Sequence, residues 1–341
     1  MINSLIIGYG KRVKNTVIPA LKLINDGNIY IYSRTYEKLI SDKDKYQFEP
    51  IKELNNDLLE KIQRIFVCTP NDIFLDIVKK ISIFNVRKIN LYLDTPILPK
   101  ISNINIEKYK EKFKNVFVSE DFYYNPLNEI IKKIISDNNL NTISKIEYIN
   151  SGHSYHSLAQ SRYLLDQSFV FFANKINDIT KFFFLKTKII ISGKRSDNGQ
   201  ILIETSKGSL IINNENEKYI LKLNYIFDDG IICGYNFNDT KINLSNELDT
   251  NFKLLKIICI KYNIKLRYLQ EQIISFVNLI SQCEKDSGKK YYLTNGIEDS
   301  FVCAVVNKIN IYFDIYLNKK SLLYLFLKFY VMIVNLKKWY L

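Results

Sequence analysis

The chain has 341 residues, which is long for one compact domain and suits two domains that share a cleft. Hydrophobic residues make up 47% of the chain and charged residues 24%, as in ordinary globular proteins. The formal net charge of +13 could suit a nucleic-acid-binding protein, but the lysines are scattered and no nucleic-acid motif accompanies them. Composition therefore argues against nucleic acid as a partner and favours an anionic cofactor or substrate.

The five cysteines lie far apart, and no Cys-x-x-Cys pair suggests a metal or redox centre. They are Cys68, Cys233, Cys259, Cys283 and Cys303. The N-terminal residues run directly into a predicted strand, without the features of a secretion signal. We therefore expect reduced core cysteines in a cytoplasmic protein.

In the first part of the chain, from residue 2 to about 121, apolar runs alternate with helical patterns, which is typical of a parallel sheet with crossover helices. The predicted strands are 4–7, 28–32, 64–67, 88–93 and 115–118. The predicted helices are 15–25, 35–40, 56–61, 73–83 and 106–113. This pattern predicts a Rossmann-type α/β domain over residues 1–121.

After residue 140 the runs become longer and rich in Ile, Tyr, Phe and Thr, which favours a largely antiparallel sheet. The predicted strands are 143–151, 187–195, 199–206, 209–213, 217–226 and 230–239. Helices are predicted over 249–283 and 295–307, and the aromatic runs 169–172 and 182–184 are interpreted as helix core. An α+β domain over residues 122–312 is expected, whose open sheet would be a natural face for a homo-oligomer such as a dimer.

The last stretch, 313–341, is a basic, apolar extension. Within it, Ile315–Leu341 carries five lysines and no acidic residue, and its apolar run is shorter than the roughly 20 residues needed to span a bilayer. It is predicted either to pack as an extra helix on a core or subunit interface, or to make peripheral contact with an anionic membrane.

A glycine turn, Gly8-Tyr9-Gly10-Lys11-Arg12-Val13, follows the first predicted strand and precedes a helical pattern. There the glycines allow the backbone to approach a pyrophosphate, whose charge is met by the helix N-terminus. Lys11 and Arg12 would add positive charge beside the phosphates. Val13 replaces the third glycine of G-x-G-x-x-G, so an ordinary glycine turn is the alternative interpretation.

The end of the second strand, Tyr32-Ser33-Arg34-Thr35, lacks the Asp or Glu that a NAD site usually offers to the ribose hydroxyls. A hydroxyl followed by Arg34 suits a 2′-phosphate. The sequence therefore favours NADP(H) over NAD(H), unless Arg34 is simply a solvated loop residue.

Taken together, these motifs resemble the glucose-fructose oxidoreductase, inositol dehydrogenase and rhizopine-catabolism family (Gfo/Idh/MocA) of NAD(P)-dependent oxidoreductases. The resemblance covers about residues 2–309, is dense in the first 130, and rests on the order and spacing of several motifs. Those motifs are Gly8-Tyr9-Gly10-Lys11-Arg12 with Ile18-Pro19-Ala20-Leu21, Tyr32-Ser33-Arg34, Val67-Cys68-Thr69-Pro70-Asn71, Asp94-Thr95-Pro96, Val118-Ser119-Glu120-Asp121 with Pro126, and residues 292–299.

The resemblance implies roles for two strand ends. Cys68, Thr69, Pro70 and Asn71 would line the nicotinamide ribose, and Asp94-Thr95-Pro96 would lie under the nicotinamide ring. Family members carry Glu-Lys-Pro at the second of these places, and Thr95 cannot supply the cationic acid that their lysine provides. The family's arginine before the crossing-helix proline is Tyr123 here, and its usual histidine after Thr-Pro-Asn is Phe74.

Both histidines of the chain lie in one short stretch, His153-Ser154-Tyr155-His156. Because histidine titrates near neutral pH and tyrosine carries a phenolic proton, His153, Tyr155 or His156 could act as the general acid in place of the lysine. The alternative is a pair of incidental polar residues in a turn. The His-x-x-His spacing lacks a nearby cysteine or carboxylate triad, so no metal is predicted.

Further polar residues are candidates for binding substrate, namely Asp121, Tyr123, Tyr124, Arg162, Lys175 and Asp178. Lys175 and Asp178 could replace a family His-x-x-Asp pair, or could be a helical i,i+3 charge pair on a solvated face. The tyrosines could equally be interface packing.

Two functional hypotheses follow. The first is an NADPH-dependent oxidoreductase that reduces a keto or imine group on a polar, anionic small molecule, such as a nucleotide-linked or modified sugar of surface-polysaccharide synthesis. The second is a family member that has lost hydride transfer and acts as a cofactor- or ligand-binding or assembly module, as the replacement by Thr95 would suggest.

Overall fold

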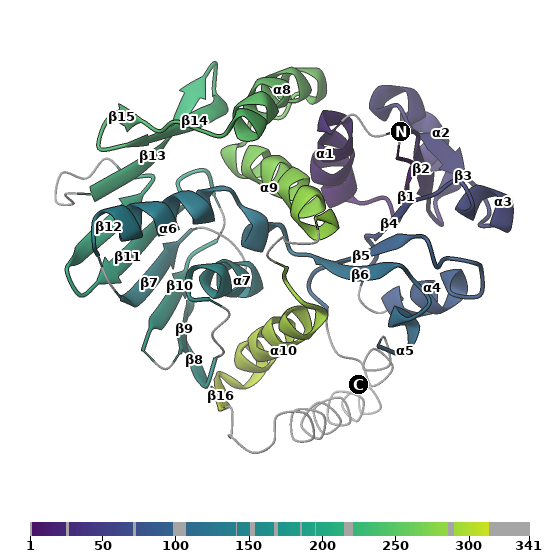
Figure 1. Cartoon of the computed structure of the whole chain (residues 1–341). Coiled ribbons are helices and arrows are strands. Elements are labelled where there is room, and N and C mark those ends of the chain that lie inside the picture. Colours follow the sequence, from purple (N-terminus) through teal and green to yellow (C-terminus); the bar gives the residue numbers. More distant parts are fainter. Residues whose placement is uncertain are drawn as a thin grey trace.

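A computed structural model describes most of the chain, and Figure 1 shows the arrangement of its elements. The described residues are 2–24, 27–70, 73–97, 107–140, 142–150, 154–166, 170–184, 186–194, 196–214, 221–285 and 290–313. Asn71, His153 and the extension Ile315–Leu341 lie outside them, so the predictions made for these residues stay predictions.

The first domain is built on a six-stranded sheet in which every paired strand is parallel to its neighbour. The strands are β1 (Ser4–Ile7), β2 (Ile29–Tyr32), β3 (Glu49–Ile51), β4 (Arg64–Val67), β5 (Asn90–Asp94) and β6 (Asn115–Ser119). Their order is β3-β2-β1-β4-β5-β6. This order reverses between β1 and β4, and ligands bind at such a point outside the carboxyl ends of the strands. The predicted Rossmann-type sheet is confirmed.

The helix that follows the glycine turn begins at Lys11, earlier than predicted, and contains a π-helical segment, Val13–Val17, before α1 (Ile18–Leu23). The amide of Ile18 donates to the carbonyl of Val13, five residues back. Pro19 has no amide hydrogen to donate to the preceding turn, which favours a widened turn at this place. The other helices of the domain are α2 (Tyr36–Tyr46), α3 (Asn56–Leu59), α4 (Phe74–Ile81) and α5 (Glu107–Lys110).

The second domain contains a ten-stranded sheet in the order β15-β14-β13-β12-β11-β7-β10-β9-β8-β16. Its strands are β7 (Ile143–Ile149), β8 (Phe172–Ile176), β9 (Ile179–Phe183), β10 (Lys188–Ser192), β11 (Gln200–Thr205), β12 (Gly208–Ile212), β13 (Leu221–Asp228), β14 (Ile231–Phe237), β15 (Thr240–Lys241) and β16 (Ile311–Phe313). The pairs β7–β10 and β12–β13 are parallel, and the other pairs among the described strands are antiparallel. The predicted mostly antiparallel open sheet is therefore confirmed.

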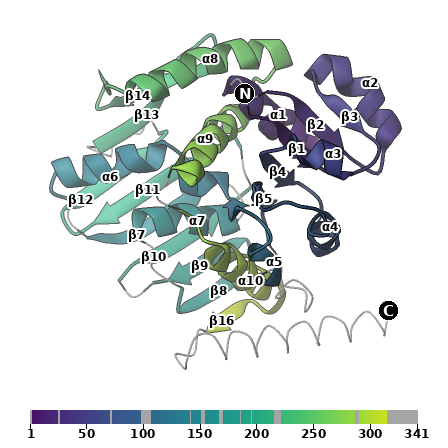
Figure 2. The ribbon, with the colours of Figure 1, turned by 45° about the vertical axis from the view of Figure 1, so that its right-hand side comes forward.

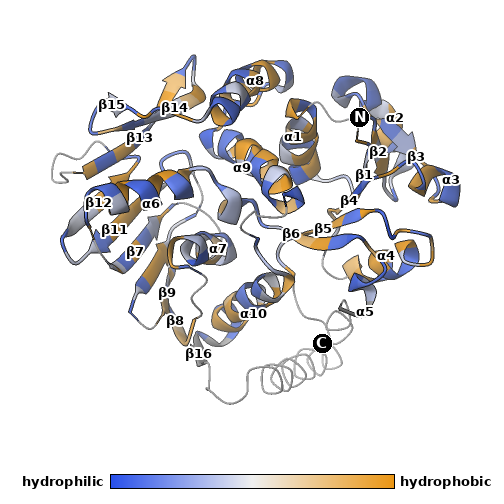
Figure 3. Cartoon of the chain, viewed as in Figure 1, coloured by the Kyte–Doolittle hydropathy of each residue, from blue (hydrophilic) through white to orange (hydrophobic). Residues whose placement is uncertain are grey.

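Helices cover one side of this sheet, as Figure 2 shows for α6, α7, α9 and α10. The helices described after β6 are η3 (Asp121–Tyr124), α6 (Leu127–Asp137), α7 (Ser154–Leu164), α8 (Asn246–Tyr262), α9 (Arg267–Glu284) and α10 (Leu293–Ile309). Apolar residues run along α9, which is buried over most of its length between the two domains (Figure 3).

Two sequence predictions about these elements were wrong. The helix predicted over 249–283 is two helices, because Asn263 adopts the left-handed conformation that ends α8. The described aromatic residues are not helix core: Phe172 and Phe183 are cross-strand partners on β8 and β9, with their rings 5.2 Å apart. Cross-strand aromatic pairs of this kind stabilise antiparallel strands.

A polar contact joins the two domains near the start of β4. Arg64 donates to both carboxylate oxygens of Glu284, at the end of α9, over 2.7 Å each. Tyr92 and Asn90 of β5 also donate to this carboxylate. Burial alone would raise the pKa of Glu284, but the hydrogen bonds and charge of Arg64 lower it below its ordinary value.

Candidate active site at the carboxyl ends of the parallel strands

The glycine turn after β1 has one closed side and one open side. Gly8 has φ of +110°, and a Cβ atom there would lie 2.3 Å from the carbonyl oxygen of Cys68 on the neighbouring β4 loop. A Cβ atom on Gly10 would meet no described atom within 4 Å. Since the next residue, Lys11, begins a helix, the open side lies over amides that have no acceptor within the helix. This arrangement suits a bound phosphate group.

The two cationic residues of the glycine turn, Lys11 and Arg12, have different surroundings. Lys11 is exposed, whereas Arg12 turns across the strand ends. The guanidinium of Arg12 contacts Asp94 (2.8 Å), Asp121 (3.2 Å) and the carbonyl of Ser119 (3.2 Å). Its charge is therefore balanced by carboxylates, which differs from its predicted place beside the phosphates. Tyr9 also turns away, because its hydroxyl donates to Asp42 on α2.

Two loops complete the predicted cofactor region. Ser33, Arg34 and Thr35 follow β2, where Arg34 is exposed and the amide of Thr35 donates to the hydroxyl of Ser33. After β4, Cys68 and Thr69 are half-buried and Pro70 is exposed. The Thr69 hydroxyl oxygen is buried and has no hydrogen-bond partner among the described residues. A bound ribose hydroxyl would supply one.

The central feature of the site is Glu120, which follows β6 and is 1% exposed. Its Oε2 accepts a hydrogen bond from the Thr95 hydroxyl (2.9 Å), and its Oε1 accepts from the Phe122 amide (3.2 Å). Its Oε1 also lies 2.7 Å from Nδ1 of His156. Sequence reasoning quoted Glu120 in a motif but gave it no role. The missed signal was a carboxylate directly after a buried parallel strand.

The imidazole of His156 packs against two aromatic rings. The ring of Phe122 stacks on it at 4.4 Å, and the ring of Tyr155 lies against it at 4.2 Å. The expected turn is a helix here, because Tyr155 and His156 belong to the first turn of α7, and His156 is buried. Burial raises the pKa of the Tyr155 phenol, so its proton is less available near neutral pH than that of an imidazole.

Among the described residues, three carboxyl groups gather at the strand ends. Asp94, Glu120 and Asp121 lie around one guanidinium, that of Arg12. Burial raises the pKa of Asp94 to about 6 against the opposing effect of Arg12. Burial and the neighbouring Asp121 raise the pKa of Glu120 well above its ordinary value. The site thus retains protons at a pH where exposed carboxyls have lost them.

Three residues of this site, Glu120, Asp121 and His156, are close enough together to be considered as metal ligands. Single ligand atoms of Glu120, Asp121 and His156 all lie within 4.8 Å of one another. However, the direct 2.7 Å contact between Glu120 and His156 and the two other donors to Glu120 already form a hydrogen-bonded set. We interpret the cluster as a proton-sharing site, and the predicted absence of a metal stays a prediction.

Several residues predicted to bind substrate have other contacts in the structure. Arg162 is 1% exposed and pairs with Asp299 of α10, so it joins two helices. Tyr123 packs edge-on against Tyr124 and Tyr163, and the Tyr124 hydroxyl accepts from the amide of Tyr291. The two tyrosines and Arg162 therefore stabilise the core next to the site.

Lys175 and Asp178 lie on the β8–β9 hairpin and not on a helix. Lys175 donates to Asn307, near the end of α10. The start of that helix touches the site, where Gly296 contacts Val118. Eleven residues separate Gly296 from Asn307, about 16 Å along a helix. The structure therefore does not bring this pair to the strand ends, whereas it does bring Asp121 there.

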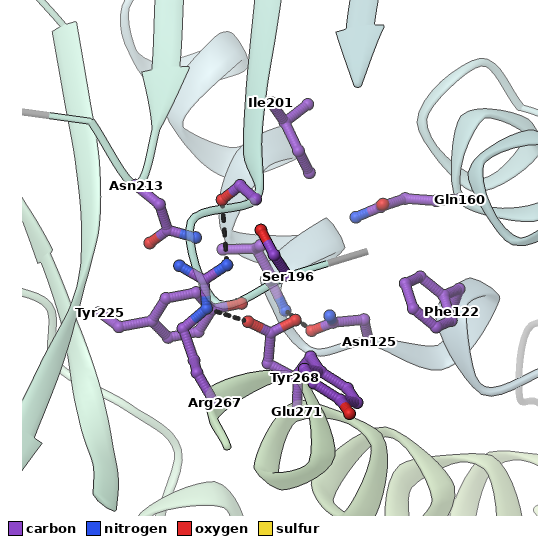
Figure 4. A pocket seen from close by; sticks show the side chains of 12 residues that line it. Phe122, Asn125, Gln160, Ser196, Ile201, Asn213, Tyr225, Arg267, Tyr268 and Glu271 are labelled. Atoms are coloured by element: carbon purple, nitrogen blue, oxygen red, sulfur yellow. Dashed lines mark hydrogen bonds and ion pairs between the residues drawn. The ribbon is translucent and has the colours of Figure 1, made fainter. Parts of the chain in front are cut away.

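A pocket adjoins the strand-end cluster at Phe122 (Figure 4). It lies between the second sheet and the start of α9, where Arg267 pairs with Glu271 at 3.0 Å and donates to the carbonyl of Gly199. The guanidinium also lies 5.5 Å from the ring centre of Tyr225. Because the cation and the carboxylate are paired, this pocket offers amides and hydroxyls more than net charge. Its lining includes Asn125, Gln160, Ser196, Asn213 and Tyr268.

The sequence matches no family model and no protein in a comparison with curated sequences. Solved structures are similar over almost their whole length. A myo-inositol 2-dehydrogenase from Lactobacillus plantarum has a TM-score of 0.59 and 13% identity, covering 92% of this chain and 99% of the other. A scyllo-inositol dehydrogenase from Lactobacillus casei with bound NAD(H) and scyllo-inositol has a TM-score of 0.58, 15% identity and the same coverage.

An oxidoreductase from Thermotoga maritima is also similar, with a TM-score of 0.54, 15% identity, and coverage of 87% of this chain and 99% of the other. The chain has the fold of these dehydrogenases. The resemblance drawn from the motifs is therefore confirmed for the inositol dehydrogenase type of fold. Among the described residues, no helix is long and apolar enough to cross a membrane.

The residues of this dehydrogenase fold fit a nicotinamide dinucleotide. Gly10 leaves space beside the helix N-terminus, and the buried hydroxyl of Thr69 lacks a partner among the described residues. Thr69 follows β4 and Gly10 follows β1, the two strands between which the sheet order reverses. Gly8, Gly10, Lys11 and Thr69 would hold the dinucleotide on this crevice.

Proposed function

We propose that this chain is an NAD(P)-dependent oxidoreductase that reduces a keto or imine carbon on a hydroxylated small molecule. The observation that carries the proposal is the hydrogen-bonded set Thr95–Glu120–His156, which lies at the ends of β5 and β6 beside the glycine turn of β1. The structural similarity to a scyllo-inositol dehydrogenase with bound NAD(H) supports the same reaction class. When bound, the nicotinamide would supply the hydride.

The proton for the reduced oxygen or nitrogen would come from His156. Its Nδ1 faces Glu120, so exchange with the substrate would use Nε2. The protonated ring gives its proton to the heteroatom as the carbonyl or imine carbon accepts the hydride, and is neutral afterwards. General acids of this kind contribute about 10²–10⁴-fold to the rate. The proton then returns to the ring from solvent.

The charge of the cluster restricts the substrate. Asp94, Glu120 and Asp121 disfavour a negative charge close to the strand ends. An anionic group of a nucleotide-linked or modified sugar would therefore lie away from them, and the reacting end would carry hydroxyl groups. We propose NADP(H) as the preferred cofactor, because exposed Arg34 follows β2 where an acidic residue would select NAD(H).

The direct test is titration of the purified protein with NADPH and with NADH, following nicotinamide fluorescence. It is followed by assays of NADPH oxidation with keto-sugars, including inosose and nucleotide-linked forms. We expect saturable binding that is tighter for NADPH, and turnover with at least one hydroxylated ketone. Absence of binding to either cofactor would refute the proposal.

A second candidate function is a binding or assembly module that keeps the cofactor site without turnover. It is favoured by one observation, the hydroxyl of Thr95 at the position where the family that the motifs resemble carries the lysine of Glu-Lys-Pro. In that case both cofactors would bind, yet no substrate would be reduced and His156→Gln would change no measurable rate.

A further inference from the structure

The surroundings of Glu120 differ from those of a carboxyl that is buried only by packing. Three hydrogen-bonding groups from three separate elements converge on it: the hydroxyl of Thr95 after β5, the amide of Phe122 in η3, and Nδ1 of His156 in α7. Thr95 uses one carboxylate oxygen and the other two groups use the second. The carboxylate therefore cannot rotate without breaking a hydrogen bond, and its plane is fixed relative to the imidazole.

We propose that Glu120 is the positioning residue of His156: it accepts the Nδ1 proton, fixes the ring in the tautomer whose Nε2 exchanges protons, and raises the proton affinity of the ring. The use of Nε2 in catalysis rests on the proposed function, whereas the tautomer and the proton affinity do not. In this interpretation position 95 does not supply the proton, as the lysine of the resembled family does. Thr95 supports a carboxylate, and the proton is carried by an imidazole from the second domain.

The packing around the ring supports this assignment. Phe122 and Tyr155 contact the imidazole at 4.4 Å and 4.2 Å between ring centres, so the ring has little freedom to turn. Oε1 of Glu120 accepts a hydrogen bond from the Phe122 amide, so it acts as an acceptor. The imidazole nitrogen that lies 2.7 Å from this oxygen therefore carries a proton, because two acceptors at that distance would repel each other. The other ring nitrogen, Nε2, is then the one at which the ring gains or loses its second proton.

Other charged and titratable groups also act on this pair and must stay unchanged in any test. They are Arg12 from the glycine turn, Asp94 at the end of β5, Asp121 beside Glu120, Tyr155 on α7, Tyr291 before α10 and Cys303 on α10. The most conservative change is therefore Glu120→Gln, which removes the negative charge and keeps the volume and one acceptor oxygen.

The composition of the chain makes the test direct, because it has two histidines. His153→Gln leaves one imidazole in the full-length protein, and nitrogen-15 labelling of histidine then reports the tautomer and the pKa of His156 alone by NMR. We expect the neutral ring to carry its proton on Nδ1. We expect Glu120→Gln in this background to lower the proton affinity of the ring at least tenfold. The matched control is Glu147→Gln on β7, which should leave the ring unchanged.

A second variant covers the case in which Glu120→Gln does not fold. Thr95→Val removes one hydrogen bond to Glu120 but keeps the buried carboxyl, and it should lower the proton affinity of the ring by less. A proton on Nε2 in the neutral ring, or identical titration with and without Glu120, would overturn the assignment. One tightly bound divalent ion per chain would also overturn it, because a metal on Nδ1 displaces the proton.

The kinetic readout separates this inference from the proposed function. In the otherwise natural sequence, Glu120→Gln should lower kcat at neutral pH, shift the pH dependence of kcat to lower pH, and leave the Kd for NADPH unchanged. If no substrate is turned over while the NMR result holds, the proposed function fails and the positioning role stands. If turnover is found but its pH profile is the same in Glu120→Gln, the positioning role fails.

Discussion

The hydroxyl of Thr95 lies 2.9 Å from Oε2 of Glu120, and this contact links the ends of β5 and β6. It makes position 95 a support for a buried carboxylate. The other oxygen of this carboxylate lies 2.7 Å from Nδ1 of His156, so the effect of Glu120 on catalysis is measured at His156.

Removing the imidazole tests its role as the proton donor. We expect His156→Gln to lower kcat about 100-fold, which is within the range for loss of a general acid. The Kd for NADPH should not change, since the space assigned to the pyrophosphate lies beside Gly10 of the glycine turn and not beside the imidazole. Fluorescence titration and steady-state rates measure both quantities. An unchanged kcat would reject His156 as the donor.

The two glycines of the first turn provide a matched pair. Gly8→Ala would place a Cβ atom 2.3 Å from a backbone oxygen at a φ of +110°, so we expect the free energy of unfolding to fall by about 2–3 kcal/mol. Gly10→Ala meets no described atom within 4 Å and should change stability by less than about 1 kcal/mol. It should instead weaken NADPH binding, because its methyl group enters the space assigned to the pyrophosphate. Equal effects of the two changes on stability would contradict this division.

The cofactor preference can be tested at one exposed residue. We expect Arg34→Ala to weaken NADPH binding about tenfold or more, because a cation beside the 2′-phosphate is lost. Binding of NADH, which lacks that phosphate, should change little. The control is Arg87→Ala, an exposed arginine three residues before β5 and therefore at the opposite end of the sheet. Loss of both cofactors to the same degree would show that Arg34 does not read the phosphate.

The contact between Arg64 and Glu284 predicts a pH dependence of stability. The folded pKa of Glu284 is lowered, so the folded protein binds fewer protons here than the unfolded chain. The stabilisation is complete above the unfolded pKa of about 4.3 and is lost as the pH falls through the lower folded value. Glu284→Gln should cost about 3 kcal/mol at pH 7, because it leaves Arg64 buried without its ion-pair partner. Denaturant unfolding at pH 7 and pH 3.5 should show the gap between variant and natural protein narrowing at low pH.

The outward face of the second sheet is the proposed dimer surface. Helices cover its other side. Half-buried apolar residues such as Ile190 on β10 and Leu202 on β11 alternate with buried residues along their strands, which places them on the outward face. We expect Leu202→Lys to convert dimers into monomers without unfolding the chain, as measured by light scattering after size exclusion and by circular dichroism. If the natural protein is monomeric at high concentration, this face of the sheet is not a dimer interface.

Local sequence patterns predicted those elements whose conformation depends mainly on their own residues. β1 and the glycine turn were predicted because a buried apolar run ends in two glycines. β3 was missed, because it is short, contains Pro50 and has the exposed residue Glu49. The break between α8 and α9 was also missed, since it depends on a left-handed Asn263 and no glycine or proline marks it.

The candidate site was predicted only in part, and the reason is the distance along the chain. His156 was a candidate because of its chemistry alone. Its partner Glu120 lies 36 residues away on another element, and only the packing of α7 against η3 brings the two together. The partner of Arg162 was not predicted for the same reason, because Asp299 is 137 residues away.

α10 is the last helix in the part of the chain that the structure describes, and it is anchored at both of its ends. α10 begins against the strand ends of the first domain, where Gly296 packs on Val118 and the amide of Ile97 donates to Ser300. It is also tied to α7 by Arg162 and Asp299, and it ends beside the hairpin that carries Lys175. A helix that is anchored to both domains restricts a hinge motion that would separate them. We therefore expect movements of surface loops to govern how fast substrate enters and product leaves.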